Sequence, residues 1–321
     1  AIKTTKFKNM KNLIRHFRSY WKDYSLLLIG LILINYPLLE SCFRKNGCNL
    51  KSFDEYKLTF ESYVTISVSL LTVVFVFTTL NHQIRASELQ NFQNKLFEMI
   101  EFHRENVGEF QLGRFKGRSI FIPMLREYRI LLRIVKKEIE RLHLIYNNEE
   151  VVNISYLIFF YGVGKTSTKI LTNALARYPK FLIKKLVIKL QNPKTIKKVR
   201  KKSKLSYIPF QGHQSRLGHY YRNLYAIVKF VHYQRINIDK YEYVRNIRSQ
   251  LSNHEQALLL INIISDIGLT WKKEFFLEKY RLVRNIPKGF FNESKEFDPT
   301  HYLPAKYMEY NDIEILRAKI G

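Results

Sequence analysis

Glycine and proline are scarce in this chain, at 12 and 8 of 321 residues. Tight turns depend on these two residues, so their scarcity argues against a turn-rich all-β fold. No internal repeat and no long Ser, Gly or Pro linker interrupts the sequence. We therefore expect an all-α protein in which residues 81–321 form one helical domain.

Cysteine is rarer still, because the chain has only Cys42 and Cys48. In an oxidising compartment this pair forms a disulfide that closes a small loop; otherwise the two are free thiols. The nine histidines are scattered, and no metal cluster, nucleophile arrangement or cofactor motif stands out. The sequence favours a protein that is not an enzyme, although it leaves that question open.

Acidic residues are absent from one long stretch. From Val151 to Ile238 there is no Asp or Glu in 88 residues, against 18 Lys and Arg, in a chain of net charge +27. This imbalance predicts an anionic partner, either nucleic acid or an anionic membrane surface. A solvated loop is the alternative. The densest basic run consists of Lys197, Lys198, Arg200, Lys201, Lys202 and Lys204.

Two apolar runs contain no charged residue, residues 24–39 and 63–80. A membrane-spanning helix needs about 20 mainly apolar residues, and the hydroxyl groups of the second run can hydrogen-bond back to their own helix. We predict a transmembrane hairpin over residues 24–80, with a loop at 40–62 outside the cell. Two buried helices of a soluble protein are the alternative.

The flanking charges predict the orientation of this hairpin. Residues 1–23 hold seven Lys and Arg against one acid, whereas the loop 40–62 holds four of each kind. The positive-inside rule then places the basic tail 1–23 and the domain 81–321 in the cytoplasm. We expect a bacterial inner-membrane protein with the lipid bilayer as its first partner.

Spacings of three and four between apolar residues predict helices over about 81–107, 122–147, 151–175 and 179–190. The sequence Tyr161-Gly162-Val163-Gly164-Lys165-Thr166 resembles a nucleotide-binding Walker A loop. That loop needs an earlier glycine, where this chain has Phe159. We interpret the segment as a junction of small residues between helices.

Arg248 and His254 are the candidate catalytic residues, because Arg-x(4–6)-His is the loose pattern of HEPN ribonucleases. In those enzymes the two side chains activate and steer a ribose hydroxyl. The same segment reads as a helix start, with Ser252 at the N-cap and Glu255 three residues later. Both the catalytic and the structural interpretations stay open.

The segment Phe210–Tyr225, wound as a helix, buries an apolar face that continues to Val231. Four polar side chains border this face: His213, Arg216, Tyr220 and Asn223. They form either an anion or nucleotide site or a buried hydrogen-bond network that fixes the helix register. Three others point away from the face: Ser215, His219 and Arg222.

This segment also carries a family resemblance. The sequence FQGHQSRLGHYYRNLY at Phe210–Tyr225 resembles the signature of the phage abortive-infection (AbiC-like) protein family. Tyr243–Glu255 and Phe276–Tyr280 resemble its second and third blocks. The resemblance implies a two-transmembrane effector of bacterial anti-phage defence that arrests or kills the infected cell. It supplies no catalytic residue to carry over.

Three functions follow as expectations. The first is a membrane effector that forms homo-oligomers and disrupts the inner membrane when its cytoplasmic domain is triggered. The second is a membrane-tethered binder of nucleic acid. Its ligand would be phage RNA or a retron complex of reverse transcriptase with its RNA–DNA product, because some effectors of this kind are coupled to retrons. The third is a ribonuclease that uses Arg248 and His254.

Overall fold

The computed structural model describes residues 53–287 and 289–291 and the single positions 25, 298, 302, 304 and 308. The chain divides into two compact units, Ala1–Phe92 and Gln93–Gly321. The basic tail 1–23, the span predicted at 24–39 (apart from Ser25) and both cysteines lie outside the described residues.

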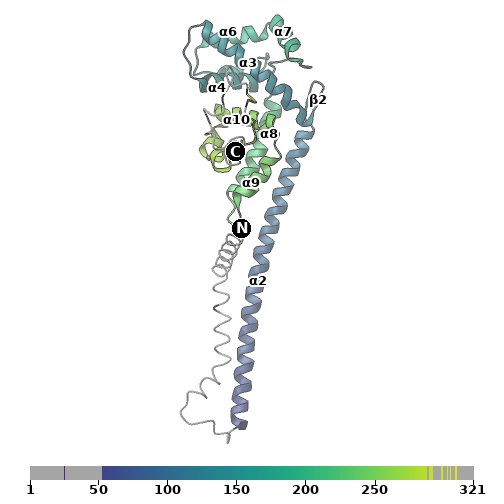
Figure 1. Cartoon of the computed structure of the whole chain (residues 1–321), viewed down its shortest axis with the longest axis vertical. Helices are drawn as coiled ribbons and strands as arrows, with labels where there is room; N and C mark the ends of the chain where they lie inside the picture. Colours follow the sequence, from purple (N-terminus) through teal and green to yellow (C-terminus); the bar gives the residue numbers. More distant parts are fainter. Residues whose placement is uncertain are drawn as a thin grey trace, which may run out of the picture. The chain divides into compact units, whose positions relative to one another are not determined.

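The described residues confirm the all-α prediction, since their only strands form a two-residue antiparallel pair (Figure 1). The elements are α2 (Phe53–Gly108), β1 (Gln111–Leu112), β2 (Phe115–Lys116), η2 (Gly117–Ile120), α3 (Phe121–Arg141), α4 (Asn148–Tyr161), α5 (Thr168–Ala174), α6 (Lys180–Gln191), α7 (Pro193–Ser203), α8 (Gln214–His232), α9 (Lys240–Ser249), α10 (Asn253–Ile264), η3 (Asp266–Gly268), α11 (Leu269–Lys273) and α12 (Phe276–Tyr280).

Helix α2 contains the second predicted span and continues without a break through the helix predicted at 81–107. Among the described residues, α2 is the one helix that is long and apolar enough to cross a membrane, and the candidate segment begins at Val64. Val73 and Phe75 are 68% and 66% exposed, so the protein's own fold leaves them uncovered. The described residues therefore show one helix with the length and composition of a span, and not a clear two-helix hairpin.

Hydroxyl groups within this apolar part are satisfied by the helix itself. Thr65, Ser69 and Thr72 each donate to the carbonyl oxygen four residues earlier, at 2.8 Å. Such back-bonding removes most of the cost of placing a hydroxyl in an apolar environment. The polar residues in this run are thus compatible with a helix in lipid.

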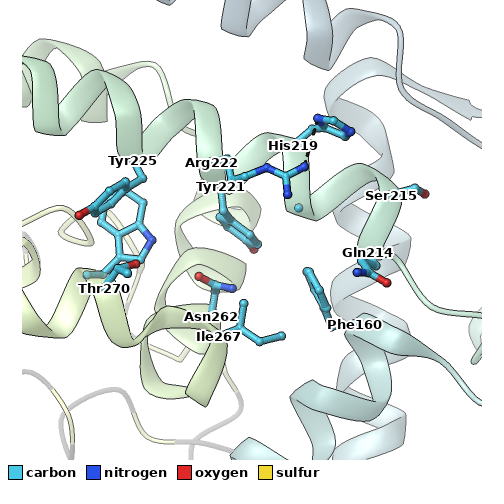
Figure 2. Close-up of a pocket in the computed structure, with 12 residues that line it drawn as sticks. Phe160, Gln214, Ser215, His219, Tyr221, Arg222, Tyr225, Asn262, Ile267 and Thr270 are labelled. Carbon is cyan, nitrogen blue, oxygen red and sulfur yellow. Dashed lines mark hydrogen bonds between the residues drawn. The ribbon is translucent and has the colours of Figure 1, made fainter. Parts of the chain in front are cut away.

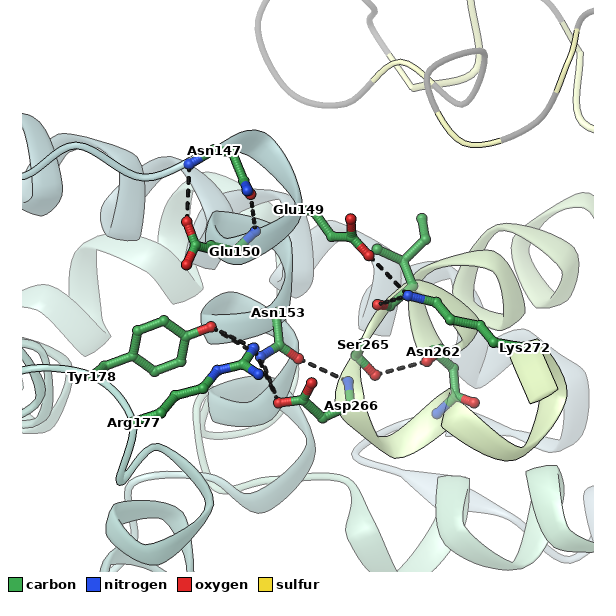
Figure 3. Close-up of polar contacts among 11 residues, drawn as sticks. Asn147, Glu149, Glu150, Asn153, Arg177, Tyr178, Asn262, Ser265, Asp266 and Lys272 are labelled. Carbon is green, nitrogen blue, oxygen red and sulfur yellow. Dashed lines mark hydrogen bonds and ion pairs between the residues drawn. The ribbon is translucent and has the colours of Figure 1, made fainter.

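Helix α2 begins at Phe53, within the segment 40–62, whose location outside the cell stays a prediction. One predicted helix boundary is wrong. The helix predicted over 122–147 ends at Arg141, and Asn147 instead begins α4. Asn147 Oδ1 accepts from the Glu150 amide at 2.8 Å, while the Glu150 carboxylate accepts from the Asn147 amide (Figure 3). Asn at the N-cap with Glu three residues later is a helix start.

The core of the second unit is built on α3, α4 and α10. Helix α3 buries one stripe of side chains, whereas α4 is buried from Val151 to Phe160 and α10 from Glu255 to Ile264. Because α4 and α10 are buried on all sides over these stretches, they pack against each other and against α3, with α8 beside α4 (Figure 1).

A polar network fixes η3 against α4. The Asn153 side chain donates to Asp266 Oδ2 at 2.8 Å and accepts from the Asp266 amide at 2.9 Å (Figure 3). It also donates to Tyr178 Oη at 3.1 Å, and the Arg177 guanidinium lies 3.2 Å from Asp266 Oδ2. This network holds the chain that follows α10 in the position needed for the cleft described next.

Candidate functional site

Helix α8 forms one wall of the candidate site, and it buries the apolar face that its sequence predicts. Its buried residues are Leu217, Tyr220, Tyr221, Leu224, Ile227, Val228 and Val231. The helix begins at Gln214, with His213 at the N-cap, so the predicted winding from Phe210 starts four residues too early. Phe210 and Gly212 have φ angles of 68° and 89°, which no α-helix contains.

A junction of two glycines fixes where α8 starts. The Val163 amide donates to the Phe210 carbonyl at 2.8 Å, and the His213 amide donates to the Phe160 carbonyl at 2.9 Å. A Cβ atom on Gly212 would lie 2.4 Å from the Tyr161 oxygen, and Gly162 is equally crowded. Both residues must therefore be glycine, and the Walker-like sequence is a junction between helices, as predicted.

Two members of the predicted polar row bind buried carboxylates. His213 Nε2 lies 3.1 Å from Glu127 Oε2, and Glu127 also accepts from Tyr207 Oη at 2.6 Å and from the Phe210 amide at 2.7 Å. Tyr220 Oη donates to Glu255 at 3.2 Å. Glu127 and Glu255 are 0% and 1% exposed, so these contacts hold α8 to α3 and α10.

The other two members of the row lie nearer the surface. The Arg216 guanidinium donates to the Gln111 carbonyl at 2.9 Å, which ties α8 to the strand pair. Asn223 is half-buried. The row is therefore spread over separate contacts along α8, and the structure does not gather it into one pocket.

The opposite side of α8 lines a cleft of about 540 Å³. Figure 2 shows it between α8, the C-terminal end of α4, and the segment from α10 to α11. Its lining residues are Phe160, Gln214, Ser215, Gly218, His219, Tyr221, Arg222, Tyr225, Asn262, Ile267, Thr270 and Trp271. These include the three residues predicted to point away from the core, namely Ser215, His219 and Arg222.

The cleft is positively charged, because its described lining residues include Arg222 but no Asp or Glu. Arg222 Nη2 lies 3.4 Å from His219 Nδ1, and both side chains are exposed. On the inner wall, burial raises the pKa of Tyr221 well above its ordinary value, and the nearby hydroxyl of Tyr156 adds to that shift. The phenol therefore stays neutral, and the cleft presents positive charge and neutral polar groups.

The basic run lies on α7. Lys197, Lys198, Arg200, Lys201 and Lys202 are exposed on the helix, and Lys204 follows at its C-cap. Val199 is the one buried residue of α7. Asn192 caps its start by accepting from the Lys194 amide at 2.8 Å, and Pro193 occupies the first helical position. The run is thus an ordered helix with a dense cationic surface.

The two candidate catalytic residues have structural partners. Arg248 is 4% exposed and donates to the carbonyl groups of Tyr280 and Arg281, at 3.2 and 2.8 Å. The His254 ring lies edge-on to Phe290, and burial, with Arg129 and Arg126 nearby, lowers its pKa.

Ser252 and Glu255 form the predicted capping box at the start of α10. The ribonuclease hypothesis therefore stays a prediction, with an arginine already used to bind two backbone carbonyls. Among the described residues, no group of three His, Cys, Asp or Glu side chains could hold a metal ion.

Comparison with known proteins matches residues 212–291 to one family, described as "Putative phage abortive infection protein". The match covers about a quarter of the chain, and it contains every cleft residue except Phe160. No curated protein and no solved structure matches the chain.

Proposed function

From this family match we propose that the chain is a membrane-anchored effector of phage abortive infection. The observation that carries the proposal is the exposed apolar part of α2, where Ile66, Val73, Phe75 and Phe77 are each at least 60% exposed. At about 25 cal/mol per Å² of apolar surface removed from water, lipid is the most favourable surrounding for such side chains.

The proposed action is disruption of the inner membrane after a trigger reaches the cytoplasmic domain. Between Glu61 and Arg85 the helix carries no Asp, Glu, Lys or Arg. A selective channel usually lines its path with charged side chains or ordered carbonyl groups. Helices of this composition, once assembled in copies, suit a general loss of the permeability barrier better than selective conduction.

The test is to induce the full-length protein in bacteria and record the membrane potential with a voltage-sensitive dye. We expect depolarisation before the loss of colony formation. Cells that stop dividing or die with their potential intact would refute the proposed action. A variant with arginine at both Val73 and Val76 is the matched control, because it should neither depolarise nor kill.

A second function, nucleic-acid binding, is favoured by the surface of α7. The six exposed basic residues of α7 have no ion pair with any described carboxylate, and the 88-residue stretch around them contains no Asp or Glu. Phosphate groups binding there would release counterions and gain affinity as salt falls. This function is compatible with the first, since a nucleic acid could be the trigger.

For α7 we expect a salt-dependent mobility shift of RNA by the detergent-solubilised protein. Replacing Lys197 and Lys201 with Gln should reduce the magnitude of the slope of log affinity against log salt by up to about 1.8, since each phosphate contact contributes about 0.7–0.9. Replacing the exposed Lys137 and Lys273 with Gln should leave the slope unchanged. Binding to anionic vesicles without any RNA shift would assign α7 to the membrane surface instead.

A further inference from the structure

The start of α8 offers unpaired backbone donors to the cleft. This helix has 19 residues, and no side chain caps its N-terminus. The amide groups of Gln214 and Ser215 donate no hydrogen bond to any described residue, while the next two amides both bind the His213 carbonyl. Free amide groups and the positive end of a helix dipole together attract an anion.

A fixed positive charge lies on the same side of the helix. Ser215, His219 and Arg222 are spaced by four and three residues, so their side chains share one face (Figure 2). The Arg222 guanidinium contacts only the His219 ring and has no carboxylate partner among the described residues. It is therefore available to a ligand phosphate as a charge-assisted donor.

The inner wall supplies a second and independent sign of a ligand. Tyr221 is 5% exposed, and its hydroxyl makes no hydrogen bond of normal geometry, although Tyr156 Oη is close enough to raise its pKa. Beside it, Asn262 is 1% exposed and uses its Nδ2 to bind Tyr156 Oη at 2.9 Å. Figure 2 shows the Tyr221 ring directed toward Asn262 along the cleft. Because buried polar groups are normally satisfied, a hydroxyl on a cleft wall whose one polar neighbour, Tyr156 Oη, lies outside normal hydrogen-bond geometry can take a ligand atom as a further partner.

The remaining wall suits a flat ring. Tyr225 is half-buried and meets the Trp271 ring edge-on, with ring centres 5.1 Å apart. Phe160 lies at the other end of the cleft. A volume of about 540 Å³ is within the range of small-molecule sites and is far larger than an inorganic phosphate needs.

We propose that this cleft binds a nucleotide, with the phosphate at the start of α8 and Arg222 and the base between Tyr225, Tyr221 and Asn262. The residues that carry it belong to the family-matched segment, but the inference does not depend on membrane disruption. The nucleotide is either free in the cytoplasm or the 5′-phosphorylated end of a single strand. Both sources present the same phosphate and base to the cleft.

Binding is measured by isothermal titration of the full-length protein in detergent micelles, with AMP, ATP and GTP as probes and a 5′-phosphorylated hexanucleotide as a separate arm. We expect at least one probe to bind. Arg222→Gln should weaken that binding roughly ten- to a hundredfold, because a charge-assisted phosphate contact is lost. Arg235→Gln removes an equal charge from an exposed position outside the cleft and should change affinity less than twofold.

A further variant, Tyr221→Phe, removes only the Tyr221 hydroxyl and keeps the ring. It should reduce the preference for one base over the others while leaving the affinity for inorganic phosphate unchanged. If only the hexanucleotide binds, and Arg222→Gln weakens that binding, the ligand of the cleft is the 5′-phosphorylated end of a single strand. No binding of any probe at millimolar concentration, or equal effects of Arg222→Gln and Arg235→Gln, would overturn the proposal.

Discussion

Arginine at both Val73 and Val76 should move the full-length protein out of the membrane fraction. Both valines are exposed on the apolar part of α2. An arginine at the centre of a spanning helix costs about 3 kcal/mol on insertion scales. Two such residues cost about 6 kcal/mol, or roughly four orders of magnitude in the insertion equilibrium.

The matched control places arginine at Phe97 and Phe102, which are exposed on the same helix beyond its apolar part. This variant should fractionate like the natural protein after carbonate extraction of membranes. If both double variants stay in the membrane fraction to the same extent, residues 64–80 are not what holds the protein there.

Replacing Glu127 with Ala should lower the free energy of unfolding by about 3–5 kcal/mol, because three donors lose their acceptor and each buried donor left unsatisfied costs about 1–3 kcal/mol. The substitution leaves Tyr207 Oη, the Phe210 amide and His213 Nε2 without their common acceptor. All three are at least half-buried, so water cannot replace the carboxylate without opening the packing.

Glu140 provides the control for this prediction, because it lies on the same helix and is exposed. Glu140→Ala should change stability by less than about 0.5 kcal/mol. Urea unfolding of the detergent-solubilised protein, followed by far-ultraviolet circular dichroism, measures both variants. Equal midpoints for the two would show that the Glu127 cluster does not anchor α8.

Local features of the fold could be read from the sequence. The apolar run 63–80, the capping box at Ser252 and the buried face of α8 each depend on residues within a few turns of one another. Periodicity and cap residues determine such features, so the sequence is enough to predict them.

Predicted helix boundaries were wrong where the same residue type can mark either the start or the end of a helix. Asn147 and Asn148 suit either end of a helix, and only Glu150 at the third position identifies Asn147 as an N-cap. No helix was predicted over the run from Lys197 to Lys204, which has no clear apolar period, although Asn192 followed by Pro193 is a helix start. In both cases the cap residues were more informative than the composition.

The candidate site could be predicted only in part. The spacing of Ser215, His219 and Arg222 places them on one face of α8, away from the core. That this face borders a cleft depends on Asn262 and Trp271, which lie between 40 and 56 residues further along the chain. The pairing of His213 with Glu127 spans 86 residues. No local pattern encodes such contacts, because they follow from how the helices pack.

Cysteine accessibility tests whether residues 64–80 of α2 lie in the bilayer. With Cys42 and Cys48 replaced by Ser, single cysteines are introduced by Val73→Cys or Phe97→Cys. Sheared membranes, which expose both faces, are then treated with a membrane-impermeant maleimide. If residues 64–80 lie in the bilayer, the cysteine at position 97 is labelled rapidly and the cysteine at position 73 is labelled only after detergent is added. Equal labelling at both positions without detergent would contradict this placement.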